Sequence, residues 1–303
     1  MNRYSLTLIV GLLFLSVLLA CKPNTSNLEK LDFGSESTFD IISWNIELFP
    51  KHRHSADIVE KVLSALKADV YALQEIKDTS LLKEIVARIP GYECIFQRNN
   101  YSGLVYVYNT NTIKVNSRYE LFPSNHYYED VRRDTFPRKP QVLDFMFNKK
   151  NYFIINNHFI CCGDGKLNIN EWWDEENRKM QAAIKLKEYI DNHLPEESII
   201  IVGDLNDQIT DPDSNNVFKD IINDSTNYLF ADMEIALNDK LNWSCPQWPA
   251  HLDHILITNE LFTSFQDTGS EITVIKIDAY LRSWNSYKRR VSDHRPIGLK
   301  LNL

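Results

Sequence analysis

The chain has 303 residues, of which 44% are hydrophobic and 24% are charged, and its formal net charge at pH 7 is −8. This length and composition are typical of a globular protein with a substantial core, in one large domain or two small ones. The negative charge argues against a protein that holds nucleic acid through bulk positive charge, but not against an enzyme that meets phosphates through a metal and a few arginines. The chain contains nine glycines and neither GxxxxGK[ST] nor GxGxxG, which argues against a glycine-rich phosphate loop.

The first elements in chain order are targeting signals. Residues 6–20 are an unbroken run of apolar and small side chains after Arg3, too short to span a bilayer, and they predict a signal peptide over 1–20. The run ends in Leu18-Leu19-Ala20-Cys21, which resembles the bacterial lipobox. That resemblance implies a lipidated Cys21 and anchoring to the membrane of the bacterial cell envelope. A plain secretory signal or an uncleaved anchor is the alternative, and residues 21–37 are predicted to be a polar tether.

Residues 38–303 are predicted to form one catalytic domain. Hydrophobic spacing predicts strands over 39–45, 69–74, 92–97, 103–109, 113–121, 141–148, 152–158, 199–202, 252–258, 271–277 and 296–301. It predicts helices over 55–67, 80–88, 171–192 and 215–223, and an irregular stretch from there to residue 249. Runs of strands with helices between them favour two packed mixed β-sheets flanked by helices, which is a four-layer α/β/β/α sandwich.

The strand over 199–202 has the most informative ending. Its consecutive β-branched residues indicate burial on both faces, and Gly203 then ends the run immediately before Asp204 and Asn206. A carboxylate and an amide beside an apolar strand are costly to bury unless a metal ion or hydrogen bonds compensate. Strand ends are also where α/β folds place their chemistry. A turn that merely caps the strand is the alternative interpretation.

Other predicted strands begin or end in similar polar residues. Taken singly, each is consistent with a turn residue or a satisfied structural histidine. The segments are Asn45, Gln74-Glu75, Asn156-Asn157-His158, Asp253-His254 and Ser292-Asp293-His294. Together they supply oxygen ligands without thiolates, which is the chemistry of Mg²⁺ or Mn²⁺ rather than of zinc.

The order of these motifs, from Asn45 to Ser292-Asp293-His294, resembles that of the endonuclease/exonuclease/phosphatase superfamily, which has the DNase I-like fold. The resemblance extends from about residue 38 to the end of the chain. It implies a pair of packed sheets with the site at one edge. It also implies metal-dependent cleavage of a phosphate ester by water.

The resemblance assigns a role to each matched residue. It implies that Glu75 is the main metal ligand and that Asn45 and Asp293 complete the shell of one or two Mg²⁺ (or Mn²⁺) ions. It implies that Asp204 orients or deprotonates the attacking water, and that Asn206 holds that water or a phosphoryl oxygen.

Histidines supply the remaining implied contacts with phosphate. The resemblance implies that His294 contacts the scissile phosphate, that Asp253 sets its tautomer, and that His158 is a second phosphate contact. Arg138 matches a less specific position, where it contacts phosphate or belongs to a solvated basic loop. Glu47 lies where some members have an additional acidic ligand.

The substrate is less well defined by the sequence. We expect a monomer that acts on nucleic acid or another phosphodiester, with a lipid or small-molecule phosphodiesterase or phosphatase as the alternative and a non-catalytic binding lipoprotein as a third. Basic residues that could bind a phosphate backbone, or be solvated surface, are Arg132, Arg133, Lys139, Lys288, Arg289 and Arg290. The four further cysteines, which could pair in an exported protein, are read as structural: Cys94, Cys161, Cys162 and Cys245.

Overall fold

A computed structural model describes residues 27–96, 103–122, 135–238 and 240–303 of the chain. The predicted signal peptide, Cys21, Arg132 and Arg133 lie outside the described residues. Within the described ranges, no helix has both the length and the apolar character needed to cross a bilayer.

Twelve strands in the described residues form two six-stranded sheets. The first sheet contains β1 (Phe39–Phe49), β2 (Val70–Ile76), β3 (Tyr92–Phe96), β4 (Val105–Asn109), β11 (Glu271–Val274) and β12 (Ile297–Leu301), in the order β11-β12-β1-β2-β4-β3. The second contains β5 (Lys114–Glu120), β6 (Gln141–Phe147), β7 (Lys150–His158), β8 (Ile199–Asp204), β9 (Tyr228–Phe230) and β10 (Asp253–Thr258), in the order β5-β6-β7-β8-β10-β9. Both sheets are mixed, because β1 and β2 are parallel, as are β7 and β8, whereas the other pairs are antiparallel.

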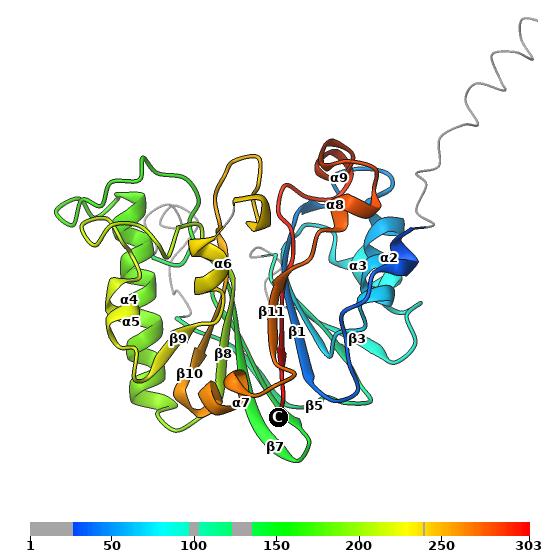
Figure 1. Cartoon of the computed structure of the whole chain (residues 1–303), viewed down its shortest axis with the longest axis horizontal. Coiled ribbons are helices and arrows are strands. Elements are labelled where there is room, and N and C mark those ends of the chain that lie inside the picture. The colour runs from blue at the N-terminus through cyan, green and yellow to red at the C-terminus, as the bar shows by residue number, and fades with distance from the viewer. Residues whose placement is uncertain (1–26, 97–102, 123–134, 239) are drawn as a thin grey trace, which may run out of the picture.

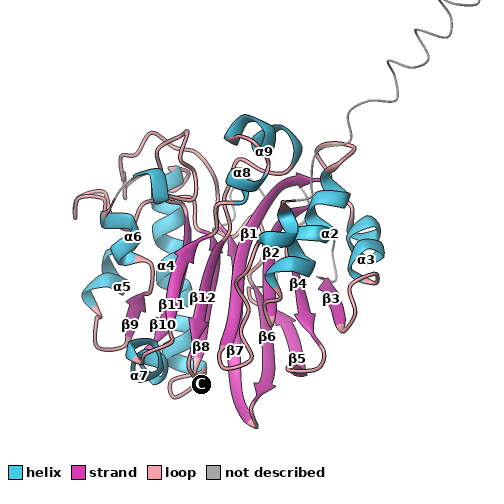
Figure 2. Cartoon of the chain, turned by 45° about the vertical axis from the view of Figure 1, so that its right-hand side comes forward, coloured by secondary structure: helices cyan, strands magenta, loops and turns pink. Residues whose placement is uncertain are grey.

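Helices flank this pair of sheets. On the first sheet lie α2 (Ser55–Leu66), α3 (Thr79–Val86), α8 (Ile277–Tyr280) and α9 (Trp284–Arg290), and on the second lie α4 (Glu175–His193) and α5 (Lys219–Asn223). Figures 1 and 2 show the strands between these two groups of helices. The remaining helices are α6 (Met233–Leu237) and α7 (Phe262–Gln266), with 3₁₀ turns η1 (Leu28–Lys30), η2 (Lys240–Asn242) and η3 (Asn259–Leu261).

The alternation of side chains along β8 explains the layers. Ile200 and Val202 belong to the apolar cluster between the two sheets, whereas Ile199 and Ile201 belong to the cluster under α4 and α5. Successive residues of a strand point to opposite faces, so a strand with apolar residues at every position needs a cover on both sides. All four side chains are at most 1% exposed. Burial of one such side chain contributes about 1.5–3 kcal/mol.

The predicted four-layer sandwich is confirmed, and the longer helices begin and end close to their predicted limits. Helix α4 starts where the Asp174 side chain accepts a hydrogen bond from Asn177 N–H, at 2.7 Å. The helices α6 to α9 were not predicted. They have four to seven residues each, which is too few turns for an apolar stripe to repeat.

The predicted tether is wrong from residue 28 onward. Leu28, Leu31 and Phe33 are at most 5% exposed and belong to the core cluster under α2 and the first sheet. Phe33 packs so closely on β12 that a Cβ at Gly298 would lie 2.5 Å from its ring. The domain therefore starts about ten residues before the predicted boundary. These three apolar residues are interspersed with polar ones, and the segment is too short to show the hydrophobic period of a helix or of a strand.

Two buried aspartates lie near the beginnings of β1 and β2. The Asp69 carboxylate accepts hydrogen bonds from Asp40 N–H at 2.9 Å and from the Thr112 hydroxyl at 2.5 Å. Burial is the main cause that raises the pKa of Asp69 to about 6; the hydrogen bonds from Thr112 and from Asp40 N–H oppose it, and the negative charge of Asp40 adds to it.

We expect this aspartate to make stability depend on pH. The pKa of Asp69 is higher in the folded chain than the ordinary 3.8, so its contribution is complete below about pH 4 and is lost as the pH rises through about 6. The loss is on the order of 2–3 kcal/mol. Asp69→Asn should remove this part of the dependence in urea titrations at several pH values. If wild type and variant lose stability equally between those pH values, Asp69 is not the cause.

Candidate active site

The ends of four neighbouring strands meet at one end of the sandwich. Strands β2, β7 and β8 end at or one residue beyond Glu75, His158 and Asp204, and Asn45 lies where the pairing of β1 with β2 shifts register. The Asn45 side-chain nitrogen donates to Asp204 Oδ2 at 2.8 Å, across the two sheets, and to Glu75 Oε1 at 3.1 Å within its own sheet. The structure therefore brings predicted residues of both sheets into one site.

Asp204 lies at the centre of this site and is 1% exposed. Its Oδ2 atom is 3.6 Å from His158 Nε2 and 3.7 Å from His294 Nε2. Burial raises the pKa of Asp204 to about 6, with Asp253 and Glu75 acting in the same direction and His294 opposing them. The carboxylate therefore has a greater affinity for a proton than an exposed aspartate has.

His294 is held by hydrogen bonds on several sides. Its Nδ1 is 2.7 Å from Asp253 Oδ2, so the Nδ1 proton is donated to that carboxylate and Nε2 faces Asp204. Ser292 Oγ accepts from His294 N–H at 2.9 Å and donates to the Asn45 carbonyl at 2.6 Å, and the Tyr287 hydroxyl donates to the His294 carbonyl. Burial opposes protonation, but the neighbouring acidic groups, with Asp253 foremost, raise the pKa of His294 well above its ordinary value.

His158 has the opposite electrostatic character. It is 3% exposed, and its Nδ1 has no hydrogen-bond partner among the residues that the structure describes. Burial, followed by the positive charges of Arg138 and His294, lowers its pKa well below the ordinary value. Its Nε2 is 3.9 Å from Glu75 Oε1. The site thus contains one neutral and one readily protonated imidazole, each beside Asp204.

Glu75 and Asn206, like Glu47 at the border of the site, have a backbone conformation that is uncommon for residues other than glycine. Glu75 has φ +61° and Asn206 has φ +55°. Local hydrogen bonds stabilise both turns, from Leu48 N–H to Glu75 Oε2 at 3.0 Å and from Asn206 N–H to Asp204 Oδ1 at 3.1 Å. Such residues cluster at functional sites because the surrounding structure must hold them there.

Gly203 allows β8 to approach β7 immediately before Asp204. It pairs with Asn157 and has φ +143°. A Cβ atom on Gly203 would lie 2.0 Å from the Asn157 carbonyl oxygen, which is backbone and cannot move aside cheaply. Glycine is therefore required here by both space and conformation.

We expect Gly203→Ala to lower the free energy of unfolding by about 3 kcal/mol or more, from backbone strain and overpacking together. Gly269→Ala is a matched control, because Gly269 has φ +105° but no atom of the described part of the chain lies within 4 Å of its would-be Cβ. The control should lose only the backbone part, about 1–2 kcal/mol. Urea unfolding of both variants measures the difference, and equal losses would show that the close approach to Asn157 is unimportant.

Three acidic side chains border the site, and their oxygens are of the kind that a hard divalent cation prefers. Glu47, Glu75 and Asp293 are partly exposed carboxylates, and Glu47 Oε2 accepts from Asp293 N–H at 2.9 Å and pairs with Lys51. Burial raises the pKa of Glu47, Lys51 opposes it, and Asp293 adds to it. A carboxylate whose pKa is raised by burial and by an acidic neighbour, as that of Glu47 is, is one whose charge a bound cation would neutralise.

Asn45 differs from its predicted part in this group. Its side-chain oxygen accepts a hydrogen bond from Glu47 N–H at 2.9 Å, while its nitrogen faces Glu75 and Asp204. In this arrangement the Asn45 nitrogen donates to the two carboxylates, and the predicted role of its oxygen as a cation ligand stays a prediction. The neighbours of Asn45 in sequence gave no indication of this orientation.

Arg138 and Asn206 meet at one backbone atom beside the site. Arg138 Nη1 donates to the Phe159 carbonyl at 3.2 Å, and Asn206 Nδ2 donates to the same oxygen at 3.3 Å. Arg138 is therefore next to the loop that carries Asn206. Lys288, Arg289 and Arg290 lie in the last turn of α9.

Cys245 is a site neighbour that the sequence did not indicate. Its Sγ lies 3.4 Å from His294 Nδ1, and the residue is 5% exposed. No spacing motif links a cysteine to a histidine 49 positions away. All four cysteines in the described residues are free, although the sulfurs of the adjacent Cys161 and Cys162 are 2.8 Å apart.

Two buried amide side chains, those of Gln74 and Asn156, link the two sheets below the site. The sequence indicated them only as residues at strand ends. Gln74 Nε2 donates to Asn156 Oδ1 at 2.8 Å, and both residues are fully buried. The polar strand ends were the available signal, but the partner across the sandwich could not be assigned from the sequence.

Comparisons with known proteins agree with this fold. The model of the Endonuclease/Exonuclease/phosphatase family matches residues 42–294. Among solved structures, TDP2 of D. rerio in complex with a single-strand DNA product has a TM-score of 0.63 at 14% identity, covering 88% of this chain and 100% of that one. The human Nocturnin catalytic domain with bound sulfate has a TM-score of 0.57 at 15% identity, covering 88% and 95%.

A third similar structure is a family protein from Bacteroides thetaiotaomicron, with a TM-score of 0.58 at 14% identity, covering 88% of this chain and 98% of that one. A search of the curated proteins found no match. Identities this low carry the fold alone, whereas the family model spans most of the chain. The chain therefore belongs to the endonuclease/exonuclease/phosphatase family and is a phosphoester-hydrolysing enzyme.

Proposed function

We propose that the protein is a divalent-metal-dependent phosphodiesterase that cleaves nucleic acid by in-line attack of water on phosphorus. The observation that carries the proposal is the position of Asp204, whose Oδ2 lies within 3.7 Å of the Nε2 atoms of both His158 and His294. A buried carboxylate can accept a proton from water, and the two imidazoles beside it can contact the oxygens of a phosphate.

Glu75 and Asp293, with Glu47 beside them, would hold one or two Mg²⁺ or Mn²⁺ ions at the edge of this site. When bound, the cation supplies positive charge against the phosphoryl oxygens and the leaving oxygen. Asn45 keeps Glu75 and Asp204 together through its two hydrogen bonds of 3.1 and 2.8 Å.

Each side chain of the site would have its own role in the hydrolysis. The oxygen of a water molecule attacks phosphorus, its proton passes to Asp204, and the bond from phosphorus to the leaving oxygen breaks. Asn206 would position that water or a phosphoryl oxygen. His294 would donate from Nε2 to a phosphoryl oxygen, because its Nδ1 is engaged by Asp253 at 2.7 Å. His158 and Arg138 would make further phosphate contacts.

Nucleic acid is favoured over other phosphodiesters by two observations. D. rerio TDP2, one of the similar structures, is a complex with a single-strand DNA product. In this chain, Trp172 and Trp173 are 49% and 57% exposed on the loop that follows β7, and Trp248 is 80% exposed. Exposed aromatic rings can stack on bases, which contributes about 1–3 kcal/mol per base. The same rings could also border a lipid site, so lipid substrates form a separate arm of the test.

The test is turnover of plasmid DNA, RNA, sphingomyelin and bis-p-nitrophenyl phosphate, with Mg²⁺ and with excess chelator. We expect cleavage of a nucleic acid and of the small diester, and loss of both when the metal is removed. Cleavage of sphingomyelin alone would assign a lipid substrate. Activity that survives the chelator would overturn the cation assignment, and inertness on every substrate would leave a binding protein.

We also propose that a lipidated Cys21 anchors the protein, as a monomer, to the bacterial cell envelope. The support is the sequence Leu18-Leu19-Ala20-Cys21 after an apolar run. Cys21→Ser should move the protein from the detergent phase to the aqueous phase on phase partition of cells that express it. A variant that stays in the detergent phase would show that another segment anchors the chain.

A further inference from the structure

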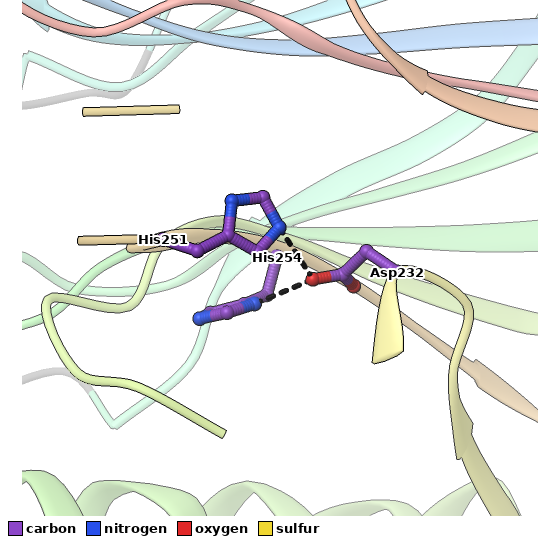
Figure 3. Close-up of side chains that lie close together, drawn as sticks. All are labelled: Asp232, His251 and His254. Atoms are coloured by element: carbon purple, nitrogen blue, oxygen red, sulfur yellow. Dashed lines mark hydrogen bonds and ion pairs between the residues drawn. The ribbon is translucent and has the colours of Figure 1, made fainter. Parts of the chain in front are cut away.

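A second cluster of buried ionisable side chains lies outside the candidate active site and is drawn in Figure 3. Asp232 follows β9, His251 precedes β10, and His254 lies within β10, and the three are at most 1% exposed. Asp232 Oδ2 lies 2.6 Å from His254 Nδ1 and 3.0 Å from His251 Nε2. Figure 3 shows the two rings approaching the same carboxylate oxygen from different sides.

Hydrogen-bond partners determine where the protons of the two rings lie. His254 Nε2 is 2.9 Å from the Asp207 carbonyl, which can only accept, and its Nδ1 faces a carboxylate, so both nitrogens carry protons. His251 Nδ1 accepts from Ser244 N–H at 3.2 Å, so its proton is on Nε2. His254 is therefore an imidazolium paired with Asp232, and His251 is neutral.

The electrostatic surroundings agree with this assignment. Burial opposes charge on both partners, but Asp232 raises the pKa of His254 above its ordinary value, and His254 and His251 lower the pKa of Asp232. The other rings packed on His254 are the apolar Phe218 and Phe230, with centroids at 6.0 and 5.8 Å.

The same three residues have the composition of a zinc site, but their hydrogen bonds do not fit one. A metal on His251 Nε2 would force the proton of the neutral ring onto Nδ1, where it would oppose the Ser244 N–H. The second oxygen of Asp232 is also engaged, because it accepts from Ile255 N–H at 2.9 Å. The hydrogen-bonding atoms of the cluster are therefore satisfied by the protons that its own two rings carry.

The cluster supports the backbone that carries the predicted catalytic residues. Asp207, whose carbonyl accepts from His254, directly follows Asn206 and is three residues after Asp204. Leu205 N–H donates to the Leu252 carbonyl at 2.9 Å, so the segment 204–207 is held against the start of β10 at two points. The positive φ of +55° at Asn206 needs such restraint.

His251 extends this support to the other side of the site. It binds the backbone of Ser244, whose hydroxyl accepts from Asp253 N–H at 3.3 Å. The Ser244 carbonyl accepts from the backbone N–H of Arg295, the residue after His294, at 2.8 Å. The cluster thus contacts segments that lead to Asp204, to Asp253 and to His294.

We propose that His254, held as an imidazolium by Asp232, is a positioning residue that fixes the Asp207 carbonyl and so orients Asp204 and Asn206 toward the scissile phosphate. The inference rests on the proposed phosphodiesterase function. His254 itself touches no substrate, because it is fully buried.

The test compares kcat and KM of His254→Phe, Asp232→Asn and the double variant on bis-p-nitrophenyl phosphate with Mg²⁺, at a temperature where circular dichroism shows all of them folded. We expect each single variant to lower kcat by about 10- to 100-fold with little change in KM, because a misplaced reacting group costs rate rather than ground-state binding. The double variant should be little worse than either single one. A kcat within about twofold of wild type in folded His254→Phe would overturn the proposal.

Phe218→Leu is the matched control, because its ring packs on His254 but takes no part in the hydrogen bonds. It should lower the melting temperature while kcat stays within about twofold of wild type, which separates positioning from general loss of stability. If it lowers kcat as much as His254→Phe does, positioning by His254 is refuted.

A measurement on wild type keeps the proposal open to refutation if the variants do not fold. Nitrogen NMR of ¹⁵N-histidine-labelled protein, with each ring assigned through its own backbone, should show His254 protonated at both nitrogens above the ordinary histidine pKa and His251 neutral with its proton on Nε2. A neutral His254, or stoichiometric zinc in the purified protein, would overturn the assignment. Wild type that lacks metal-dependent turnover refutes the proposed function, whereas active wild type with fully active His254→Phe refutes the inference alone.

Discussion

Asp204→Asn should lower kcat on a nucleic acid or on bis-p-nitrophenyl phosphate by about 10³-fold, with little change in KM. The amide is nearly the same size as the carboxylate and can still accept the hydrogen bond from Asn45, seen at 2.8 Å in the structure. It cannot accept a proton from water. The fold should therefore persist while the chemical step fails.

The control for this change is Asp213→Asn, which removes an equal charge from a side chain that is 88% exposed and lies outside the site. Its rate should match that of wild type within about twofold, as is usual for surface changes. Steady-state kinetics with saturating Mg²⁺ measures both variants. If Asp204→Asn retains more than a tenth of the wild-type kcat, the base must be another group.

His294→Gln should lower kcat by about 10²- to 10³-fold, because it removes a donor aimed at the phosphoryl oxygen. Asp253→Asn should have a smaller but still large effect, since Asp253 acts by holding His294 through the 2.7 Å bond to Nδ1. The double variant should be about as active as His294→Gln alone, because a residue that acts through another adds little once that partner is gone.

A double-mutant cycle on kcat/KM measures this coupling. Effects that simply multiply would show that Asp253 and His294 act independently, in conflict with the assigned hydrogen bond. The cycle also tests Cys245, which lies 3.4 Å from the same ring nitrogen. We expect Cys245→Ser to leave the coupling intact, because Asp253 already engages the proton on Nδ1.

Local patterns were sufficient to predict the layers of the fold. The β-branched run at Ile199–Val202 specified a strand covered on both faces, and the structure covers it with the other sheet on one side and with α4 and α5 on the other. Short helices such as α8 and the buried residues Leu28 and Phe33 escaped prediction, because a few residues cannot display a period.

The residue types and their order were also enough to select the family and the candidate residues. Burial of polar side chains at the ends of apolar strands costs free energy unless a metal ion or hydrogen bonds compensate. The sequence could not state which of them touch. Asn45 and Asp204 are 159 positions apart, and Asp253 and His294 are 41 apart. Contacts of that separation depend on the packing of whole sheets, which periodicity does not encode.

By itself, then, the sequence determined a two-sheet phosphoesterase with an oxygen-rich site at its strand ends. Only the tertiary structure decided that Asn45 donates to two carboxylates, and that His254 is a buried cation beneath the Asp207 carbonyl. The physical reason is that donor or acceptor roles and protonation states belong to partners and not to single residues. A histidine in a strand becomes an imidazolium only when the fold brings a carboxylate to one nitrogen and a carbonyl to the other.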